Sequence, residues 1–444
     1  MPLSTISPLD GRYANKVKEL SAYVSESALI RYRVMVEVEY VIALGEEKGV
    51  KELKRLSPKA KSELRSLYKK FSEADAEAIK QIELEINHDV KAVEYFIKQK
   101  YPSEFIHFAL TSEDVNNLAY SLMWRDALRD SIAPTLNHLH KTLTACAKRH
   151  KNQPMLSLTH GQPATPTTVG KEFAVFAARL KRQVDQLKTH RLLGKLNGAT
   201  GTYGAMVVAY PNVNWQNFSK KFVESFGFDW NPLTTQIEPH DSLAESFYIL
   251  SRVNTIFLDF TRDTWLYISR GIFGQKKKDG EVGSSTMPHK INPIQFENAE
   301  GNLGLANALL LHLAEKLPMS RMQRDLTDST VLRNIGVPLG HSLLAYKSIL
   351  SGLSRLVVSK QRLNEELEDH WEVLAEPIQT VLRKVGHEKP YEKLKELTRG
   401  TTITKKDIQN FIKKLDIPEE EKNKLLKLTP HNYTGIADIL AARF

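Results

Sequence analysis

The chain contains almost no cysteine, with Cys146 as the only one among 444 residues. A disulfide framework needs paired cysteines and a cysteine-based metal site needs a cluster of them, so the sequence predicts neither. No run approaches the ~20 apolar residues of a membrane span, and the first residues lack the basic and apolar segments of a secretion signal. These absences predict a cytoplasmic protein that has no membrane segment and no membrane partner.

Two common nucleotide-binding motifs are missing as well. The sequence has neither a Gly-x-Gly-x-x-Gly dinucleotide loop nor a Gly-Lys-Ser/Thr phosphate loop. Its formal net charge is +10, from 62 lysines and arginines against 52 acidic residues, but the basic residues are scattered and form no long block. This distribution favours a small anionic metabolite over nucleic acid as the partner.

Length and apolar pattern predict the architecture. A chain of 444 residues exceeds what one compact core usually serves, and we divide it into three regions, 1–110, 111–364 and 365–444. The middle region has long segments with apolar residues at helical spacing, and residues 243–268 are apolar on several faces. We therefore expect an all-α fold with a central bundle of long helices. Because these helices are apolar on more than one face, the bundle requires either a thick core or burial of the remaining apolar faces by other subunits.

Residues 280–303 interrupt these helices with a concentration of glycine, hydroxyl, proline and amide side chains. Gly280 and Gly283 make the first half of this segment pliable, whereas Pro288 and Pro293 stiffen the second half. Such a segment suits a lid that closes over a substrate. A surface linker is the alternative interpretation.

Residues 283–293, Gly-Ser-Ser-Thr-Met-Pro-His-Lys-Ile-Asn-Pro, resemble the signature loop of the fumarase/aspartase superfamily. Enzymes of this superfamily cleave C–N or C–O bonds and release fumarate. The histidine at position 289, with motifs along essentially the whole chain, makes the sequence most similar to the adenylosuccinate lyase family. The resemblance implies a homotetramer whose central helices merge into one bundle, active sites shared between chains, a small-molecule substrate, and no metal or other cofactor.

Several further motifs match substrate-binding positions of that family, although each has a plainer interpretation. The Asp-Gly-Arg-Tyr segment at 10–13 is otherwise a solvated turn, and Asn-His-Asp at 87–89 is otherwise a helix cap. Thr-Ser-Glu-Asp at 111–114 is a helix start, whose free N–H groups also suit an anion. The resemblance assigns substrate binding to Arg12, Tyr13, Asn87, His88, Asp89, Thr111, Ser112, Gln236, Asn292, Arg324, Ser329 and Arg333.

The reaction that the resemblance implies is a β-elimination. A base removes a proton from the carbon next to a carboxylate of a succinyl group, and an acid protonates the departing nitrogen. Ser284 matches the family's base, although spacing does not distinguish it from Ser285, and Lys290 suits the charge that develops. His160 matches the general acid, with Glu297 as the carboxylate that orients it.

The matching acid lies in a segment rich in glycine and proline. Residues 159–166, Thr-His-Gly-Gln-Pro-Ala-Thr-Pro, are predicted to form a rigid break ahead of a helix. Such a break fixes the backbone of His160 and leaves its side chain accessible. A capping turn without a catalytic function is the alternative.

The resemblance implies two substrates of purine biosynthesis. Adenylosuccinate gives AMP, and succinylaminoimidazole-carboxamide ribotide gives aminoimidazole-carboxamide ribotide, each with release of fumarate. One alternative is another fumarate-releasing lyase, such as argininosuccinate lyase, aspartase or fumarase. His289 and the arginines at 324 and 333 argue against this alternative. The other is a non-catalytic structural or RNA-binding relative, which would not need the serine, histidine, lysine and glutamate together.

Overall fold

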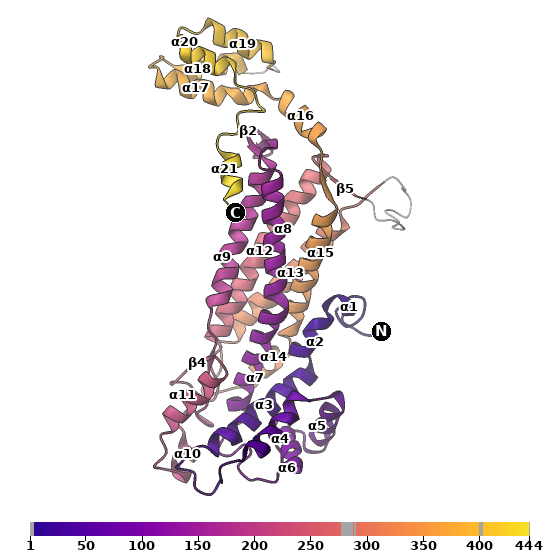
Figure 1. The fold of residues 1–444 in the computed structure, drawn as a ribbon, viewed down its shortest axis with the longest axis vertical. Coiled ribbons are helices and arrows are strands. Elements are labelled where there is room, and N and C mark those ends of the chain that lie inside the picture. The colour runs from indigo at the N-terminus through magenta and orange to yellow at the C-terminus, as the bar shows by residue number, and fades with distance from the viewer. Residues whose placement is uncertain (1–3, 277–286, 288–289, 399–402, 444) are drawn as a thin grey trace. The chain divides into compact units, whose positions relative to one another are not determined.

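The computed structural model describes residues 4–276, 287, 290–398 and 403–443. Helices make up most of this part of the chain (Figure 1), which confirms the expected helical fold. No helix in these ranges is long and apolar enough to cross a membrane. The helices are α1 (Ala14–Val17), η1 (Lys18–Leu20), α2 (Ser21–Val24), α3 (Glu26–Leu44), α4 (Pro58–Lys69), α5 (Glu73–Ile86), α6 (Asp89–Lys100), α7 (Ser112–Ala127), η2 (Leu128–Ile132), α8 (Ala133–Arg149), α9 (Val169–Thr189), α10 (Gly204–Ala209), α11 (Trp215–Ser225), α12 (Asp241–Ser269), α13 (Ile294–Lys316), α14 (Thr327–Leu332), α15 (Gly336–Arg355), α16 (Lys360–Glu368), η3 (Trp371–Leu374), α17 (Ala375–Lys384), α18 (Pro390–Thr398), α19 (Lys405–Lys414), α20 (Glu419–Leu426) and α21 (Ala437–Ala442).

Short strands accompany the helices, which the sequence pattern did not predict. Each strand pairs with one partner only, β1 with β2, β3 with β4, and β5 with β6. The strands are β1 (Pro154–Thr159), β2 (Gln162–Thr168), β3 (Leu193–Gly194), β4 (Asp229–Trp230), β5 (Phe273–Gln275) and β6 (Leu356–Val358).

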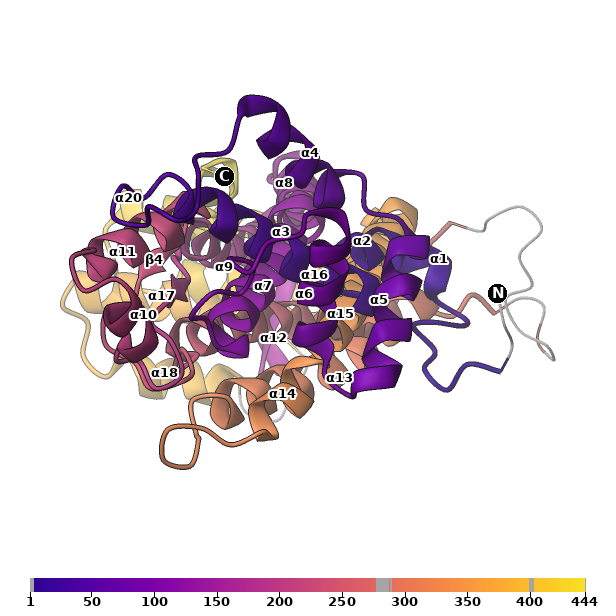
Figure 2. The same ribbon diagram turned by 90° about the horizontal axis from the view of Figure 1, so that it is seen from below.

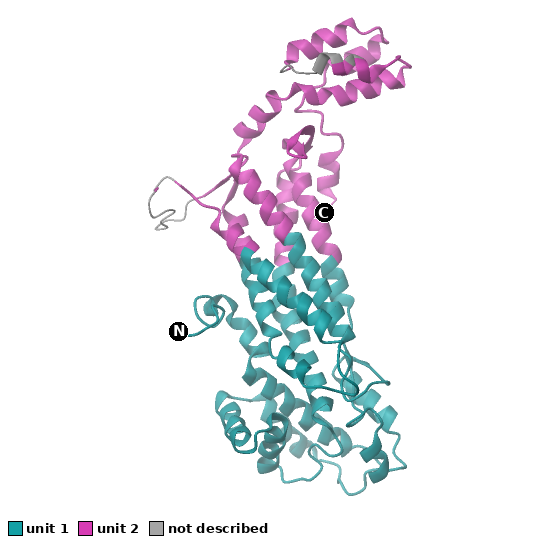
Figure 3. Cartoon of the chain, turned by 180° about the vertical axis from the view of Figure 1, so that it is seen from behind, with its two compact units in different colours: residues 1–136, 183–257, 301–347 teal, residues 137–182, 258–300, 348–444 magenta. Residues whose placement is uncertain are grey.

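The chain divides into two compact units (Figure 3). The boundary falls within long helices, so that α12 gives its residues up to Phe257 to unit 1 and the remainder to unit 2. The expected division into three regions stays a prediction. Unit 1 comprises residues 1–136, 183–257 and 301–347, and unit 2 comprises residues 137–182, 258–300 and 348–444.

Helix α3 forms the centre of the N-terminal part of unit 1. It begins after Ser25, whose side chain accepts the N–H of Ala28. The helix contacts α4, α6 and α7, and Figure 2 shows these helices gathered around it. Apolar residues lie on every face of α3, and two charged residues, Arg33 and Glu37, are buried with them. A charge in such surroundings has to be paired.

Unit 1 also contains a bundle formed by α7 and parts of α12 and α15. The indole N–H of Trp124 on α7 donates to Ser246 on α12 at 2.7 Å. The hydroxyl of Tyr346 on α15 donates to Asn254 on α12. These buried polar groups find their partners on the neighbouring helix, and the pairing fixes how the helices are aligned.

Aromatic packing holds α9, α12 and α13 together in unit 2. The ring centroid of Phe260 lies 5.2 Å from that of Phe176 and 6.3 Å from that of Phe296. On α15, Gly352 packs directly against Phe296, because a Cβ at that position would lie 2.7 Å from the ring. Further along the same unit, α17 to α20 bury an apolar cluster of their own.

The segment around His160, predicted as a rigid break ahead of a helix, is a β-hairpin that precedes α9. Strand β1 pairs antiparallel with β2, so that Thr159 lies opposite Gln162. His160 and Gly161 form the two-residue turn with φ values of 55° and 72°, the combination of a type I′ turn. The prolines of β2 are tolerated because both strands of a two-stranded sheet are edges.

Candidate active site

The start of helix α7 is tightly fixed in unit 1. The N–H of Thr111 donates to Asp114 Oδ2 at 2.9 Å, as in a capping box. Asp114 is fully buried, and its Oδ1 lies 2.9 Å from the ammonium of Lys195, which is also fully buried. The same carboxylate accepts the N–H of Asn197 at 2.9 Å. Because Ser112 is the first residue of the helix, this pair fixes both hydroxyl residues predicted to bind substrate.

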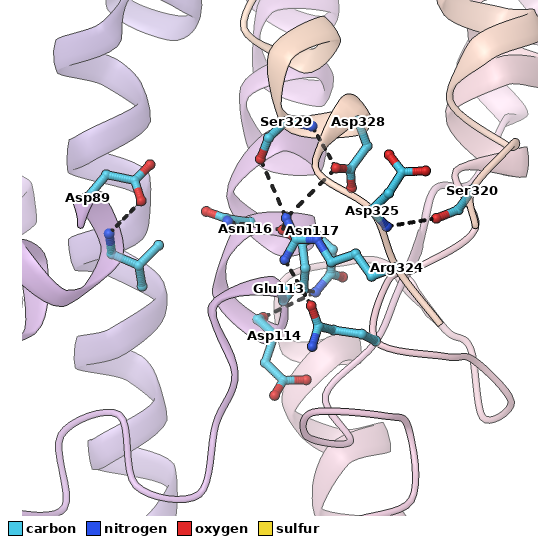
Figure 4. A network of polar contacts seen from close by, with 12 residues as sticks. Asp89, Glu113, Asp114, Asn116, Asn117, Ser320, Arg324, Asp325, Asp328 and Ser329 are labelled. Carbon is cyan, nitrogen blue, oxygen red and sulfur yellow. Dashed lines mark hydrogen bonds and ion pairs between the residues drawn. The ribbon is translucent and has the colours of Figure 1, made fainter. Parts of the chain in front are cut away.

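Arg324 links three segments of unit 1 (Figure 4). Its Nη1 donates to Gln236 Oε1 at 3.1 Å, and its Nη2 donates to Ser329 Oγ at 3.4 Å. The same Nη2 lies 3.1 Å from Oε1 of Glu113, on the first turn of α7. The structure thus brings Gln236, Arg324 and Ser329, three residues that the sequence predicts to bind substrate, into direct contact.

A hollow of about 610 Å³ opens beside Arg324. Its wall consists of Ala199, Thr200, Gln236 and residues 321–326. The Nε of Arg324 is buried, and it has no hydrogen-bond partner within the described part of the chain. A guanidinium in the wall of a hollow of small-molecule size suits the binding of an anionic group.

A second cluster of charges lies at the start of α6 in the same unit. His88 caps this helix, since its Nδ1 accepts the N–H of Lys91 at 3.2 Å. The Oδ2 of Asp89 lies 2.8 Å from Nη2 of Arg33 and 3.2 Å from Nη2 of Arg333. Burial by itself would raise the pKa of Asp89, but the guanidinium groups hold that pKa below its ordinary value. The carboxylate therefore stays charged and holds both arginines.

Other predicted binding residues of unit 1 occupy turns. Asn87 follows α5 in the left-handed conformation, with φ at 53°, which asparagine tolerates better than most residues. Arg12 is exposed, and its guanidinium lies 5.9 Å from the centroid of the Tyr13 ring. The substrate-binding roles of these residues stay predictions.

His160 lies at the tip of the β1–β2 hairpin in unit 2, where its side chain is exposed. No hydrogen bond or ion pair engages its imidazole among the residues that the structure describes. Glu297, in the first turn of α13, accepts the indole N–H of Trp265 at 3.1 Å. The predicted pairing of Glu297 with His160 thus stays a prediction.

The signature loop lies only partly within the described residues. Lys290 is exposed, and Asn292 is half-buried. Ser284 and Ser285 lie outside the described residues, as does His289. Across the described ranges, no three histidine, cysteine, aspartate or glutamate side chains are grouped so that they could hold a metal ion.

Sequence reasoning missed the buried polar residues of unit 1 that contact these groups. Arg33 is one, and the available signal was that this arginine, unlike Arg31, falls at helical spacing from the apolar Leu29 and Val36 of α3. Glu113 belongs to the predicted helix start at 111–114, and no motif assigns a role to Asn116. His240 is buried at a φ of 64°, and burial lowers its pKa; its Nε2 lies 4.0 Å from Oδ2 of Asp328.

Two protein-family models match the chain. The model described as "Lyase" matches residues 11–307, and the model described as "Adenylosuccinate lyase C-terminal" matches residues 320–434. Both sets of predicted residues, in unit 1 and in unit 2, fall within these matches.

Curated relatives match over the full length of the chain. The chain is 55% identical to the adenylosuccinate lyase of Haemophilus influenzae over 443 residues, which covers 98% of this chain and 97% of the relative. It is 53% identical to the adenylosuccinate lyase of Escherichia coli strain K12, with the same coverage. It is 52% identical over 450 residues to that of Legionella pneumophila strain Corby, which covers 100% of this chain and 99% of the relative.

Solved structures resemble the chain at lower sequence identity. A fumarate lyase from Mesorhizobium sp. BNC1 is 18% identical with a TM-score of 0.75, and 97% of each chain is covered. The 3-carboxy-cis,cis-muconate lactonizing enzyme from Pseudomonas putida is 21% identical with a TM-score of 0.73, and 98% of each chain is covered. These two likenesses show the fold alone.

Proposed function

The chain belongs to the adenylosuccinate lyase family, and on that premise we propose how its residues carry out the reaction. It is a C–N lyase, which splits adenylosuccinate into AMP and fumarate in purine biosynthesis. The proposal adds succinylaminoimidazole-carboxamide ribotide as a second substrate. Both molecules carry the same succinyl-amino group and a phosphate, so the same binding groups serve them.

The observation that supports substrate binding is the contact of Arg324 with Gln236 and Ser329 in unit 1. Gln236, Ser329 and the carboxylate of Glu113 hold the guanidinium of Arg324 in place, and a fixed arginine in the wall of a hollow is prepared for a phosphate or carboxylate. Arg333, half-exposed beside Asp89, supplies a second cation. The remaining ligands of the proposal are Arg12, Tyr13, Asn87, His88, Asp89, Thr111, Ser112 and Asn292.

The chemistry of the proposal begins with proton abstraction. Ser284, as an alkoxide, removes the proton from the succinyl carbon next to a carboxylate, and the electron pair of that C–H bond is delocalised onto the carboxylate. Lys290 and Asn292 stabilise the added negative charge, because preorganised cations and dipoles are usually the largest catalytic term. A serine is a poor base in water, so the nearby Lys290 and the closing of the loop over the substrate are both needed.

The second step breaks the C–N bond. The electron pair held on the carboxylate forms the carbon–carbon double bond of fumarate, and the bonding pair of the C–N bond goes to the purine nitrogen. His160 donates a proton to that nitrogen as it leaves. Glu297 orients the imidazole and stabilises its charged form. Because the electrons stay within the substrate, no external redox partner takes part.

The proposal includes a homotetramer in the cytoplasm, with active sites shared between chains. The exposure of His160 at its hairpin tip supports this, because a general acid needs a shielded site that this hairpin lacks within its own unit. Exposed apolar side chains on the long helices support it as well. They include Trp265 and Leu266 in unit 2 and Leu305 in unit 1, which other subunits would cover.

A turnover assay tests this function directly. Purified protein is incubated with adenylosuccinate, the ultraviolet absorbance is followed, and AMP and fumarate are detected by chromatography. Turnover is the expected result. A folded, tetrameric preparation without turnover contradicts the assignment, and argininosuccinate, aspartate and malate are then the substrates to compare.

A further inference from the structure

A series of buried side chains in unit 1 runs between helices α3 and α7. The Nε of Arg33 donates to Oδ1 of Asn116 at 2.9 Å. The Nδ2 of Asn116 donates in turn to Oε1 of Glu113 at 3.0 Å. Arg33, Asn116 and Glu113 are only 3%, 5% and 1% exposed. No role in binding or catalysis follows for these three residues from the motifs of the sequence.

The series ends at the two arginines of the proposed substrate site. Oε1 of Glu113 lies 3.1 Å from Nη2 of Arg324 (Figure 4). At the other end, Arg33 and Arg333 share Oδ2 of Asp89, at 2.8 Å and 3.2 Å. The side chains of Arg324 and Arg333 are 14% and 48% exposed, so the ends of the series reach solvent and its middle does not.

We propose that Asn116 is a positioning residue for substrate binding, whose amide couples Arg324 to Arg333 through Glu113 and Arg33. The inference rests on the proposed function, because it takes the two arginines as ligands of the substrate's anionic groups. Asn116 itself is buried and does not touch the substrate.

An amide suits this place because it offers a fixed acceptor and a fixed donor on one flat group. Its oxygen faces the cation Arg33, and its nitrogen faces the anion Glu113, so only one orientation satisfies both neighbours. Burial raises the pKa of Glu113, and Arg324 together with the hydrogen bond from Asn116 opposes that rise. A connected buried series of this kind is rigid, and rigidity reduces the entropy lost when the arginines bind an anion.

The first experiment compares Asn116→Leu with a matched control on the same helix. Ser121→Ala also alters a buried polar residue of α7 but lies outside the series. We expect Asn116→Leu to raise the KM for adenylosuccinate and the Kd of AMP, measured by calorimetry, at least tenfold, with a smaller change in kcat. Ser121→Ala should leave both constants within about twofold. An Asn116→Leu protein with wild-type KM and Kd overturns the inference.

A second comparison separates positioning from a general loss of structure. In an Arg324→Met background, Asn116→Leu should weaken AMP binding much less than it does in the wild type, because one of the groups it positions is gone. An equal weakening in both backgrounds indicates that Asn116 only stabilises the fold, and it overturns the inference.

A rescue variant covers the case in which Asn116→Leu does not fold. Asn116→Asp places a second carboxylate against Glu113. Adding Glu113→Gln to Asn116→Asp leaves a single carboxylate, at position 116, and supplies an amide N–H that donates to it. The double variant should recover at least part of the AMP affinity that Asn116→Asp loses, and no recovery contradicts the inference. Turnover by the wild type tests the proposed function separately, so the two failures are distinguishable.

Discussion

The ammonium of Lys195 lies 2.9 Å from the carboxylate of Asp114, and neither side chain is exposed to solvent. The same Nζ donates to the carbonyl of Gly198 at 3.1 Å. One buried ion pair in unit 1 therefore joins the first turn of α7 to the segment that follows β3. A lysine in a surface ion pair contributes much less to the free energy of unfolding, and this difference can be tested directly.

Replacing Lys195 by methionine should destabilise the protein strongly. The change leaves Asp114 buried without its cation, and breaking a buried pair in this way typically costs about 3–5 kcal/mol of unfolding free energy. Urea unfolding measures the loss. Lys220→Met is the matched control, because Lys220 pairs with Glu224 at 3.9 Å on the surface and should change stability by less than about 1 kcal/mol. Similar small losses for both variants would contradict this account.

The pair of His107 and Glu37 should make stability depend on pH. Nδ1 of His107 lies 2.5 Å from Oε1 of Glu37, which is fully buried. Burial alone would lower the pKa of His107, but Glu37 opposes it and the pKa is raised above 6.5. A raised pKa means that the folded protein holds the proton more tightly than the unfolded chain does. The pair's contribution is therefore complete below about pH 6.5 and is lost as the pH rises through the raised pKa.

His107→Asn tests this dependence, because asparagine accepts the φ of 59° at that position. The melting temperature of the wild type should exceed that of the variant most at low pH, and the difference should shrink from about pH 6.5 upward. A constant difference across that window would show that the proton on His107 has no part in stability.

Ser284→Ala should lose nearly all turnover and keep its affinity for AMP, because in the proposed mechanism it removes the base and leaves the binding groups in place. Ser285→Ala is the matched control on the adjacent residue and should retain far more activity. The kcat of each variant with adenylosuccinate decides between them. A Ser284→Ala protein within about tenfold of wild type, some 1.4 kcal/mol of barrier, would move the base to another residue.

Glu297→Gln should change the pH–rate profile. If Glu297 stabilises the charged imidazole of His160, its neutral replacement makes the acid lose its proton more easily, so the alkaline fall in kcat moves to lower pH. Trp265→Phe removes the indole N–H that donates to Glu297 but keeps the carboxylate charge. Trp265→Phe should therefore leave the pH–rate profile unchanged. An unaltered profile in Glu297→Gln would refute the pairing with His160.

Local features of this protein were readable from the chain itself. The long helices follow from apolar residues spaced three and four apart, as in the pattern that became α12. The capping box of Thr111 and Asp114 involves atoms only three residues apart, so a short segment carries the whole signal. The resemblance of residues 283–293 pointed to the family, and the full-length relatives confirm it.

The hairpin at His160 shows where local pattern was insufficient. Glycine and proline in residues 159–166 predict a rigid break ahead of a helix, and the pairing of β2 with β1 makes this segment a hairpin. A short strand forms where a second strand supplies hydrogen-bond partners for its backbone. The pattern of one segment does not show which second strand that is.

By itself, then, the sequence determined the long central helices, the helix start at 111–114 and the family, because periodicity, capping and motif identity are properties of short segments. Only the tertiary structure decided which polar groups meet. Arg33 and Asn116 are 83 positions apart, and their hydrogen bond exists because α3 packs on α7. Lys195 looked like one of many scattered lysines, and folding placed it in the interior beside Asp114. Such pairs depend on the packing of whole helices, in which burial turns a polar side chain into one that requires a specific partner.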